Sequence, residues 1–403
     1  MKTKLIALTL LSATAGVVAL YPAYQSIGAV PAPAIAANPP TAGIIAQQQQ
    51  RIEVVFVLDT TGSMGGMIEA AKEKIWSIAS SMASADPAPE IRIGLVAYRD
   101  RGDSYVTRVL DLSQDLDSIY AELMEFQAAG GGDGPESVNQ ALNDAVNRIS
   151  WSRDDDTYRA IFLVGDAPPH MDYLDEVSYP ETLRLAGQRG IAVNTIQCGD
   201  SPRTRNEWNR IAQLGSGSYF QVGQNGGALA ISTPFDEQIA GLSRKLDQTR
   251  LYYGSEEKRK QQKKKLAASE KLHADASVAS RARRATFNAS KSGRDNFLGE
   301  GELVEDVASG RVEMDRIDPA HLPEPMRAMA PAAQQAMVQE KLEQRRELEQ
   351  QINRLTEQRA DYIKEQVAER GDAEASLDHK IYQAVKRQAE SKGLHYGAEA
   401  PAY

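Results

Sequence analysis

The chain has 403 residues, enough for two domains or for one domain with a long appendage. Its formal net charge is −9 at pH 7, and the acidic excess lies in residues 51–250, which carry 18 basic and 29 acidic side chains. An acidic region of this kind argues against nucleic acid and against an anionic lipid surface as its partner.

The N-terminal residues have the layout of a secretory signal. Lys2 and Lys4 precede an apolar run over residues 5–20, and small residues follow at 34–37. We therefore predict that residues 1–37 are a signal peptide or an N-terminal membrane anchor, and that residues 38–50 are a linker. The expected location is periplasmic, membrane-anchored or secreted.

Cys198 is the single cysteine of the chain, so no disulfide forms within it. It ends an apolar run that is typical of a strand, which predicts a buried structural thiol.

Residues 51–250 alternate apolar runs with helical patterns, which predicts an α/β domain with a doubly wound, mostly parallel sheet. The first strand, over residues 54–58, is apolar throughout, as expected of a strand buried on both faces. A strand at 91–97 is expected to pair with an antiparallel edge strand at 105–112. The other predicted elements are helices at 67–82, 115–126, 138–149, 180–188, 206–214 and 235–246, and strands at 160–164, 191–197 and 219–222.

The chain changes character after residue 250. Residues 251–330 are dense in charge and end in a Pro-rich stretch, which predicts a charged linker with a hinge. Residues 331–403 are predicted to be mostly helical. Apolar side chains there follow heptad-like spacing, but polar ones interrupt the series, so a self-associating coiled coil and a helical hairpin both remain open. The apolar positions are Val338, Leu348, Ile352, Leu355 and Tyr362, and the interruptions are Lys341, Arg345, Arg359 and Gln366.

Polar side chains follow two of the predicted strands. Asp59 ends the first strand, and Thr61 and Ser63 follow it at spacings of two; Asp166 ends a later apolar strand, and Asp133 lies in a glycine-rich turn between them. The carboxyl ends of parallel strands meet at one edge of a sheet, so these side chains are expected to converge. Hard oxygen ligands and clustered acids favour Mg²⁺, with Ca²⁺ or Mn²⁺ as alternatives. Read alone, the first motif could also be a polar turn that caps the next helix.

The first and third loops resemble those of the von Willebrand factor type A (VWA) domain, a Rossmann-like fold. Its metal-ion-dependent adhesion site uses a D-x-S-x-S motif, which Asp59, Thr61 and Ser63 match with Thr in place of the first Ser, and an Asp in a third loop, which Asp166 matches. The resemblance covers residues 51–250. It implies a bound cation with an open coordination position that an oxygen of a protein partner completes.

The second loop departs from the usual pattern. Gly132 stands where many members have Thr, and Asp133 follows it, as in the G-G-G-D-x-P-E variant that accompanies the D-A-P-P-H form of the third loop. Asp133 would bind the cation directly or through water, and direct binding would weaken capture of an acidic partner. Glu136, at a helix start, is favoured by the helix dipole, with a ligand role left open. His170 is expected to be a rim residue bonded to backbone, because Mg²⁺ sites rarely use imidazole.

The motifs are compatible with three functions. The leading one is a non-enzymatic, divalent-cation-dependent protein-binding module of the adhesion type in the cell envelope. The alternative is an envelope scaffold or assembly protein that acts through its helical C-terminal region, with a structural metal site. A metal-assisted hydrolase is disfavoured, because the chain has no H-E-x-x-H, G-x-S-x-G or G-x-x-x-x-G-K motif.

Overall fold

The computed structural model describes residues 49–132, 134–226, 231–370 and 376–397. The predicted signal or anchor at 1–37, nearly all of the linker at 38–50, and Asp133 lie outside these ranges and stay predictions. Among the residues described, no helix has both the length and the apolar character needed to cross a membrane.

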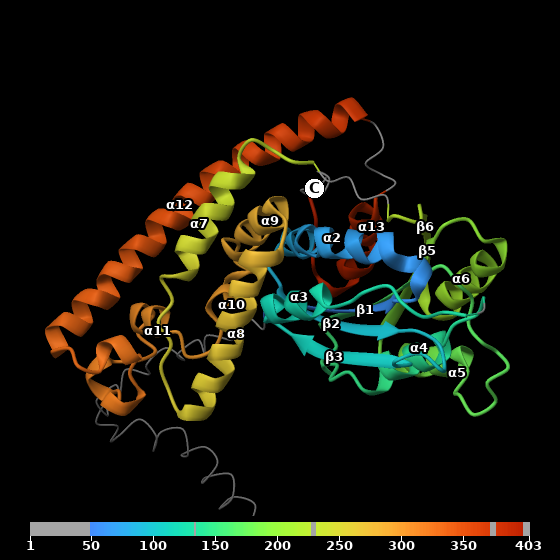
Figure 1. Ribbon diagram of the computed structural model, residues 1–403, viewed down its shortest axis with the longest axis horizontal. Coiled ribbons are helices and arrows are strands. Elements are labelled where there is room, and N and C mark those ends of the chain that lie inside the picture. The colour runs from blue at the N-terminus through green and yellow to red at the C-terminus, as the bar shows by residue number, and fades with distance from the viewer. Residues whose placement is uncertain (1–48, 133, 227–230, 371–375, 398–403) are drawn as a thin grey trace, which may run out of the picture. The chain divides into compact units, whose positions relative to one another are not determined.

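A six-stranded sheet in the order β3-β2-β1-β4-β5-β6 organises the fold (Figure 1). All neighbouring pairs are parallel except β2 and β3, so the predicted mostly parallel sheet with one antiparallel edge strand is confirmed. The strands are β1 (Arg51–Asp59), β2 (Glu90–Tyr98), β3 (Thr107–Ser113), β4 (Tyr158–Gly165), β5 (Ile191–Cys198) and β6 (Ser216–Val222).

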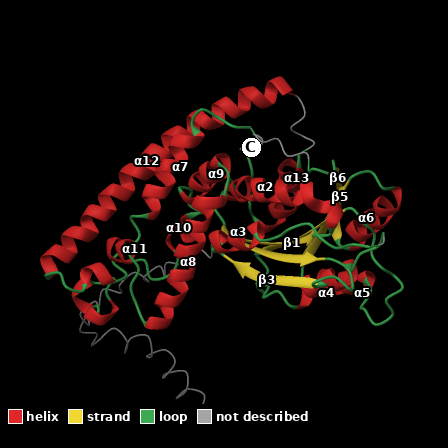
Figure 2. Cartoon of the chain, viewed as in Figure 1, coloured by secondary structure: helices red, strands yellow, loops and turns green. Residues whose placement is uncertain are grey.

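Helices cover both faces of the sheet (Figure 2). The central strand β1 explains why: Phe56 and Leu58 pack into the apolar core on one face, whereas Val55 and Val57 pack into the core on the other. The thiol of Cys198 is buried, as predicted. One face carries α2 (Gly65–Ala83) and α3 (Leu116–Met124), and the other carries α4 (Val138–Asn147), α5 (Tyr179–Gln188) and α6 (Pro202–Leu214).

Residues 256–308 form helices, so the predicted charged linker was wrong for this stretch. Its charges have specific partners: Arg284 is buried between Asp117 and Asp247, and Lys265 pairs with Asp115. The elements after β6 are α7 (Asp236–Asp247), α8 (Glu256–Asp275), α9 (Val278–Asn288), α10 (Arg294–Leu298) and α11 (Leu303–Ala308), with 3-10 turns at Met314–Arg316, Pro319–His321, Glu324–Met326 and Glu390–Lys392.

The helix α12 (Pro331–Arg370) runs without a break beside α7, so this segment is not a hairpin (Figure 1). Its buried apolar residues, among them Leu348 and Ile352, pack on helices of the same chain. The two arginines that interrupt the heptads are also buried there, where Arg345 pairs with Glu302 and Arg359 with Asp236. The heptad-like face therefore serves intrachain packing.

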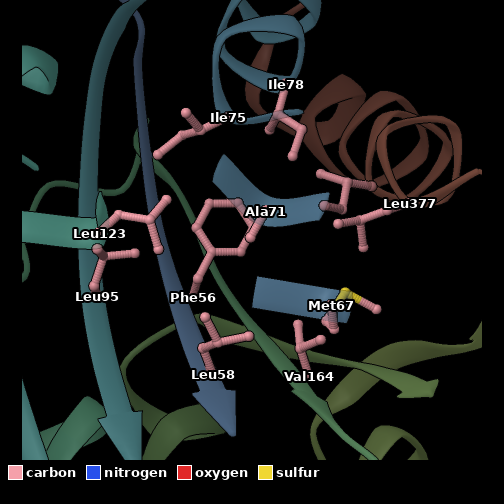
Figure 3. A pocket seen from close by; sticks show the side chains of 11 residues that line it. Phe56, Leu58, Met67, Ala71, Ile75, Ile78, Leu95, Leu123, Val164 and Leu377 are labelled. Carbon is pink, nitrogen blue, oxygen red and sulfur yellow. The ribbon is translucent and has the colours of Figure 1, made fainter. Parts of the chain in front are cut away.

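The last helix, α13 (Leu377–Ala389), packs on α2 and belongs to the core of the sheet domain. Leu377 lines a small apolar cavity of about 30 Å³ together with Phe56 and Met67 (Figure 3). Beside it, Lys74 Nζ lies 2.9 Å from Asp378 Oδ2 in a buried salt bridge. The described residues from 49 onward group into one compact unit, so the helices after residue 331 belong to the same unit as the sheet.

Candidate metal centre

The strand order brings the first and third loops to the same edge of the sheet. β1 and β4 are parallel neighbours in which Leu58 pairs with Val164, so Asp59 stands opposite Gly165 and Asp166 follows directly. A Cβ atom on Gly165 would overlap the Tyr98 hydroxyl oxygen and lie 3.2 Å from Asp59 Oδ2. The missing side chain therefore leaves room for the Tyr98 hydroxyl group and for the carboxylate, and the two acids share one rim.

Asp59 is fully buried, and its two carboxylate oxygens differ in their hydrogen bonding. Its Oδ1 accepts hydrogen bonds from the backbone N–H of Thr61 at 2.9 Å and from Thr61 Oγ1 at 2.7 Å. Its Oδ2 is buried and makes no hydrogen bond of good geometry among the described residues, although the hydroxyl group of Tyr98 lies close to the carboxylate. Burial, and secondarily the charge of Asp166, raise the pKa of Asp59 to about 7 against the opposing effect of the hydrogen bonds from Thr61 and, to a smaller extent, from Tyr98. The donors described around Asp59 are therefore neutral, and no cation among the described residues compensates its charge.

Ser63 and Asp166 are joined by a residue that the sequence did not indicate. Gln224, in the turn after β6, donates from Nε2 to Asp166 Oδ2 at 2.6 Å and to the backbone oxygen of Ser63 at 3.3 Å. Ser63 lies in a 3-10 turn, Gly62–Met64, and is exposed. A single glutamine in a loop has no sequence signal that would have identified this role.

The second loop packs on the first through its glycines. The backbone N–H of Gly62 donates to the oxygen of Gly130 at 3.1 Å. Gly130 and Gly131 have φ values of +77° and +75°, a region that L side chains rarely adopt. A Cβ on Gly131 would lie 3.2 Å from Thr61 Cβ, so the glycine run permits the close approach of the two loops. The predicted ligand role of Asp133 lies outside the described residues.

Glu136 is a further acid at this rim, and only 3% of its surface is exposed. The same hypothetical Cβ on Gly131 would lie 3.2 Å from Glu136 Oε1, so this carboxyl group faces Thr61 across the glycine. The helix-dipole argument made from the sequence gave no reason to expect a carboxyl group directed toward the rim.

The ring of His170 lies between acids. Nδ1 lies 2.8 Å from Asp172 Oδ1, and Nε2 lies 3.4 Å from Asp100 Oδ2. The ring also stacks on Tyr173 with centroids 4.1 Å apart. Its backbone N–H behaves as expected of a rim residue, donating to the oxygen of Glu136.

The donor chemistry at the rim fits a hard divalent cation. Asp59 and Glu136 form no salt bridge with any Lys, Arg or His side chain that the structure describes, and each has a buried oxygen without a hydrogen-bond partner. No group of three or more His, Cys, Asp and Glu side chains in the described ranges has metal-binding geometry. The hydroxyl groups of Thr61 and Ser63 would therefore have to contribute to the ligand set, as oxygen donors suited to Mg²⁺ or Ca²⁺ do.

Comparison with known proteins gives the family of this region. Residues 53–234 match the family model of the von Willebrand factor A domain. The von Willebrand factor A domain-containing protein 7 of Mus musculus is 38% identical over 157 residues, and its Homo sapiens counterpart is 35% identical over 155 residues. These alignments cover 39% and 38% of this chain, and 16% of each relative. The alpha-protein kinase vwkA of Dictyostelium discoideum is 28% identical over 120 residues, which are 30% of this chain and 19% of the relative.

Solved structures give a weaker likeness. The VWA domain of SpRpn10 is 14% identical with a TM-score of 0.33, over 43% of this chain and 89% of that one. Proximal thread matrix protein 1 from the mussel byssus is also 14% identical, with a TM-score of 0.34, over 44% of this chain and 43% of that one. At these TM-scores the likeness supports no conclusion about function, and the chain spans less than a fifth of the curated relatives named above. The sequence match is specific to the sheet region: the chain contains a von Willebrand factor A domain, matched over residues 53–234.

Proposed function

We propose that this protein is a non-enzymatic, divalent-cation-dependent protein-binding module. The observation that carries the proposal is the carboxylate of Asp59, which is fully buried and has no cationic partner among the described residues, at the edge where Thr61 and Asp166 also lie. An unpaired buried charge is costly, and a bound cation would remove that cost.

The residues that would hold the ion are Asp59, Thr61, Ser63 and Asp166, with Asp133 as a further predicted ligand. Mg²⁺ is the first choice, and Ca²⁺ and Mn²⁺ are the alternatives, because the donors are hard oxygens. When bound, the ion would supply an open coordination position for an oxygen atom of a protein partner.

The surface beside the rim supports a protein as the partner. Met171, Leu174 and Val177 are exposed by 53%, 95% and 42%, and all three follow Asp166 within one loop. Arg101 steadies this loop by stacking over the Tyr173 ring at 4.0 Å. Exposed apolar side chains grouped next to a polar site favour a macromolecular contact.

We also propose that the protein acts outside the cytoplasm. The support is the signal-like pattern of residues 1–37, which would lead to export or to membrane attachment by the N-terminal segment.

Calorimetric titration of the full chain tests the metal site. Mg²⁺ added to chelator-treated protein is expected to bind at one site in the wild type and not in Asp59→Asn. Absence of binding to the wild type by Mg²⁺, Ca²⁺ and Mn²⁺ alike would refute the proposal.

The protein-binding role is tested by affinity capture from envelope extracts with and without Mg²⁺. Leu174→Ser is expected to reduce the Mg²⁺-dependent capture. The matched control is Leu214→Ser, because Leu214 is 47% exposed but ends α6 just before the start of β6, at the opposite edge of the sheet. Equal capture with and without Mg²⁺ would contradict a role for the cation in binding.

A further inference from the structure

The backbone of Glu136 is fixed between the second and third loops. Its N–H donates to the oxygen of Pro168 at 2.9 Å, and its oxygen accepts from the N–H of His170 at 3.0 Å, forming a parallel bridge with Pro169. The residue therefore cannot move independently of the loop that carries Asp166.

The side chain of Glu136 is enclosed and unsatisfied. It is 3% exposed, and its Oε2 is buried without a hydrogen-bond partner in the described part of the chain. Its Oε1 and Thr61 Cβ each lie 3.2 Å from the position that a Cβ on Gly131 would take. The carboxyl group thus lies where the first and second loops meet.

A helix-capping role does not account for this carboxyl group. The helix α4 begins at Val138 with Ser137 as its N-cap, and no backbone N–H of the helix donates to the Glu136 side chain in the described residues. The favourable helix dipole remains, but it does not require burial without hydrogen bonds.

The charged groups with the largest effect on Glu136 are all carboxylates. Burial, followed by the charges of Asp59, Asp100, Asp103 and Asp166 in that order of effect, together raise the pKa of Glu136 to about 9. Arg99, a buried arginine near the rim, donates instead to the backbone oxygens of Thr60 and Gln127 and to Ser104 Oγ. Nothing described in the fold compensates the charge of this carboxylate.

From this geometry we infer that Glu136 is a ligand of the divalent cation and supplies the contribution of the second loop, where Gly132 provides no side chain. The inference rests on the metal site proposed above and adds a residue to it. A carboxylate in place of a neutral hydroxyl group adds a negative charge to the ligand set. The bound ion would therefore be held more tightly by the chain and would attract a partner's carboxylate less strongly.

The test compares Mg²⁺ affinity in the full, chelator-treated chain by calorimetry, with Mn²⁺ binding followed by electron paramagnetic resonance as a second readout. Glu136→Gln keeps the shape of the side chain and removes its charge. We expect it to weaken the binding of both ions at least tenfold. Glu136→Asp keeps the charge on a shorter side chain and is expected to weaken binding as well, because a ligand must reach the ion.

Glu53→Gln is the matched control. Glu53 is a fully buried glutamate on β1 with an unpartnered Oε1, but it lies at the opposite end of the strand from Asp59. Its substitution is expected to leave both affinities unchanged. Melting of each variant in chelator checks that it folds, and Glu136→Gln is expected to melt no lower than the wild type because it replaces a buried carboxyl group surrounded by other acids with a neutral group of the same shape.

The outcomes separate the two proposals. If Asp59→Asn abolishes binding while Glu136→Gln stays within twofold of the wild type, the metal site stands and Glu136 is not a ligand. Wild-type affinity in Glu136→Asp would show that charge alone matters and would also overturn the inference. If the wild type binds neither ion, the proposed function fails first.

Discussion

Two clusters of buried acids in this fold differ in whether a basic side chain compensates their charge. In the first, Arg284 lies between α3 and α7, with Nη2 2.5 Å from Asp117 Oδ2 and Nη1 2.8 Å from Asp247 Oδ2. In the second, at the carboxyl edge of the sheet, Asp59 and Glu136 are equally enclosed but have no basic partner among the described residues.

The pKa values of the acids in the two clusters shift in opposite directions. The guanidinium of Arg284 holds the pKa values of Asp117 and Asp247 well below their usual range in spite of burial. At the sheet edge, burial raises the pKa of Asp59 to about 7 and that of Glu136 to about 9. In the first cluster the buried charges compensate one another, and the cluster connects the sheet domain to the added helices. The second cluster has no internal cation, as expected of a site that binds a cation from solution.

The largest expected effect comes from removing the internal cation. Arg284→Met removes the buried ion-pair partner of Asp117 and one of the partners of Asp247, which keeps Arg250 and His273. We expect it to lower the free energy of unfolding by about 3–5 kcal/mol, measured by urea unfolding. Arg316→Met is the control, because Arg316 is 78% exposed in its pair with Glu313 and is expected to change stability by less than about 1 kcal/mol. Equal effects of the two substitutions would contradict the structural role of the Arg284 cluster.

Neutralising one acid in each cluster is expected to change the stability of the metal-free protein in opposite directions. Asp117→Asn removes a charged hydrogen-bond acceptor of Arg284 and should cost about 2–3 kcal/mol. Asp59→Asn removes an uncompensated buried charge and should leave the metal-free protein as stable as the wild type or more stable. Thermal melting of both variants in chelator makes the comparison, and a large loss of stability in Asp59→Asn would break it.

The two clusters are also expected to respond to pH in opposite directions. The folded protein holds its proton at Asp59 up to about pH 7, whereas the unfolded chain releases it near pH 4, so the contribution of Asp59 to metal-free stability should fall by about 2 kcal/mol from pH 5 to pH 7. The lowered pKa values of Asp117 and Asp247 instead give stability that is present above about pH 4 and is lost as the pH falls below it.

Urea unfolding in chelator at pH 5 and pH 7 measures how far the metal-free stability falls between these two pH values. Asp59→Asn is the reference, because it lacks the contribution of Asp59. Identical slopes in the wild type and the variant would show that Asp59 is not the group responsible.

The smallest effect is expected at Gln224, the neutral partner of Asp166. Gln224→Ala removes a hydrogen bond from an exposed side chain and should change the free energy of unfolding by no more than about 1 kcal/mol in chelator. A loss comparable to that of Arg284→Met would mean that the sheet edge is already satisfied by neutral groups.

The sequence predicted what depends on local pattern. Apolar runs such as residues 54–58 and helical spacing over 67–82 were enough for the order and type of the strands and helices of the sheet domain. The ends of two apolar strands also placed Asp59 and Asp166 at one edge, because the geometry of parallel sheets fixes where such ends lie.

The features that the sequence did not predict depend on contacts between side chains that are distant along the chain. Residues 256–308 resembled a linker because the charge of Arg284 is compensated by Asp117, which is 167 residues away. The core role of α13 rests on the pair of Lys74 and Asp378, 304 residues apart. Arg345 interrupted the heptads for a reason that only its buried contact with Glu302 reveals.

Thermal unfolding of the wild-type chain, in chelator and then with Mg²⁺ at about 100 times its dissociation constant, tests the central claim most directly. Binding to the folded state alone should add about 2.7 kcal/mol and raise the melting temperature of the wild type and of Arg316→Met, but not of Asp59→Asn. A wild-type melting temperature that is the same with and without Mg²⁺ would contradict the claim that the unmatched acids of the sheet edge form a cation site.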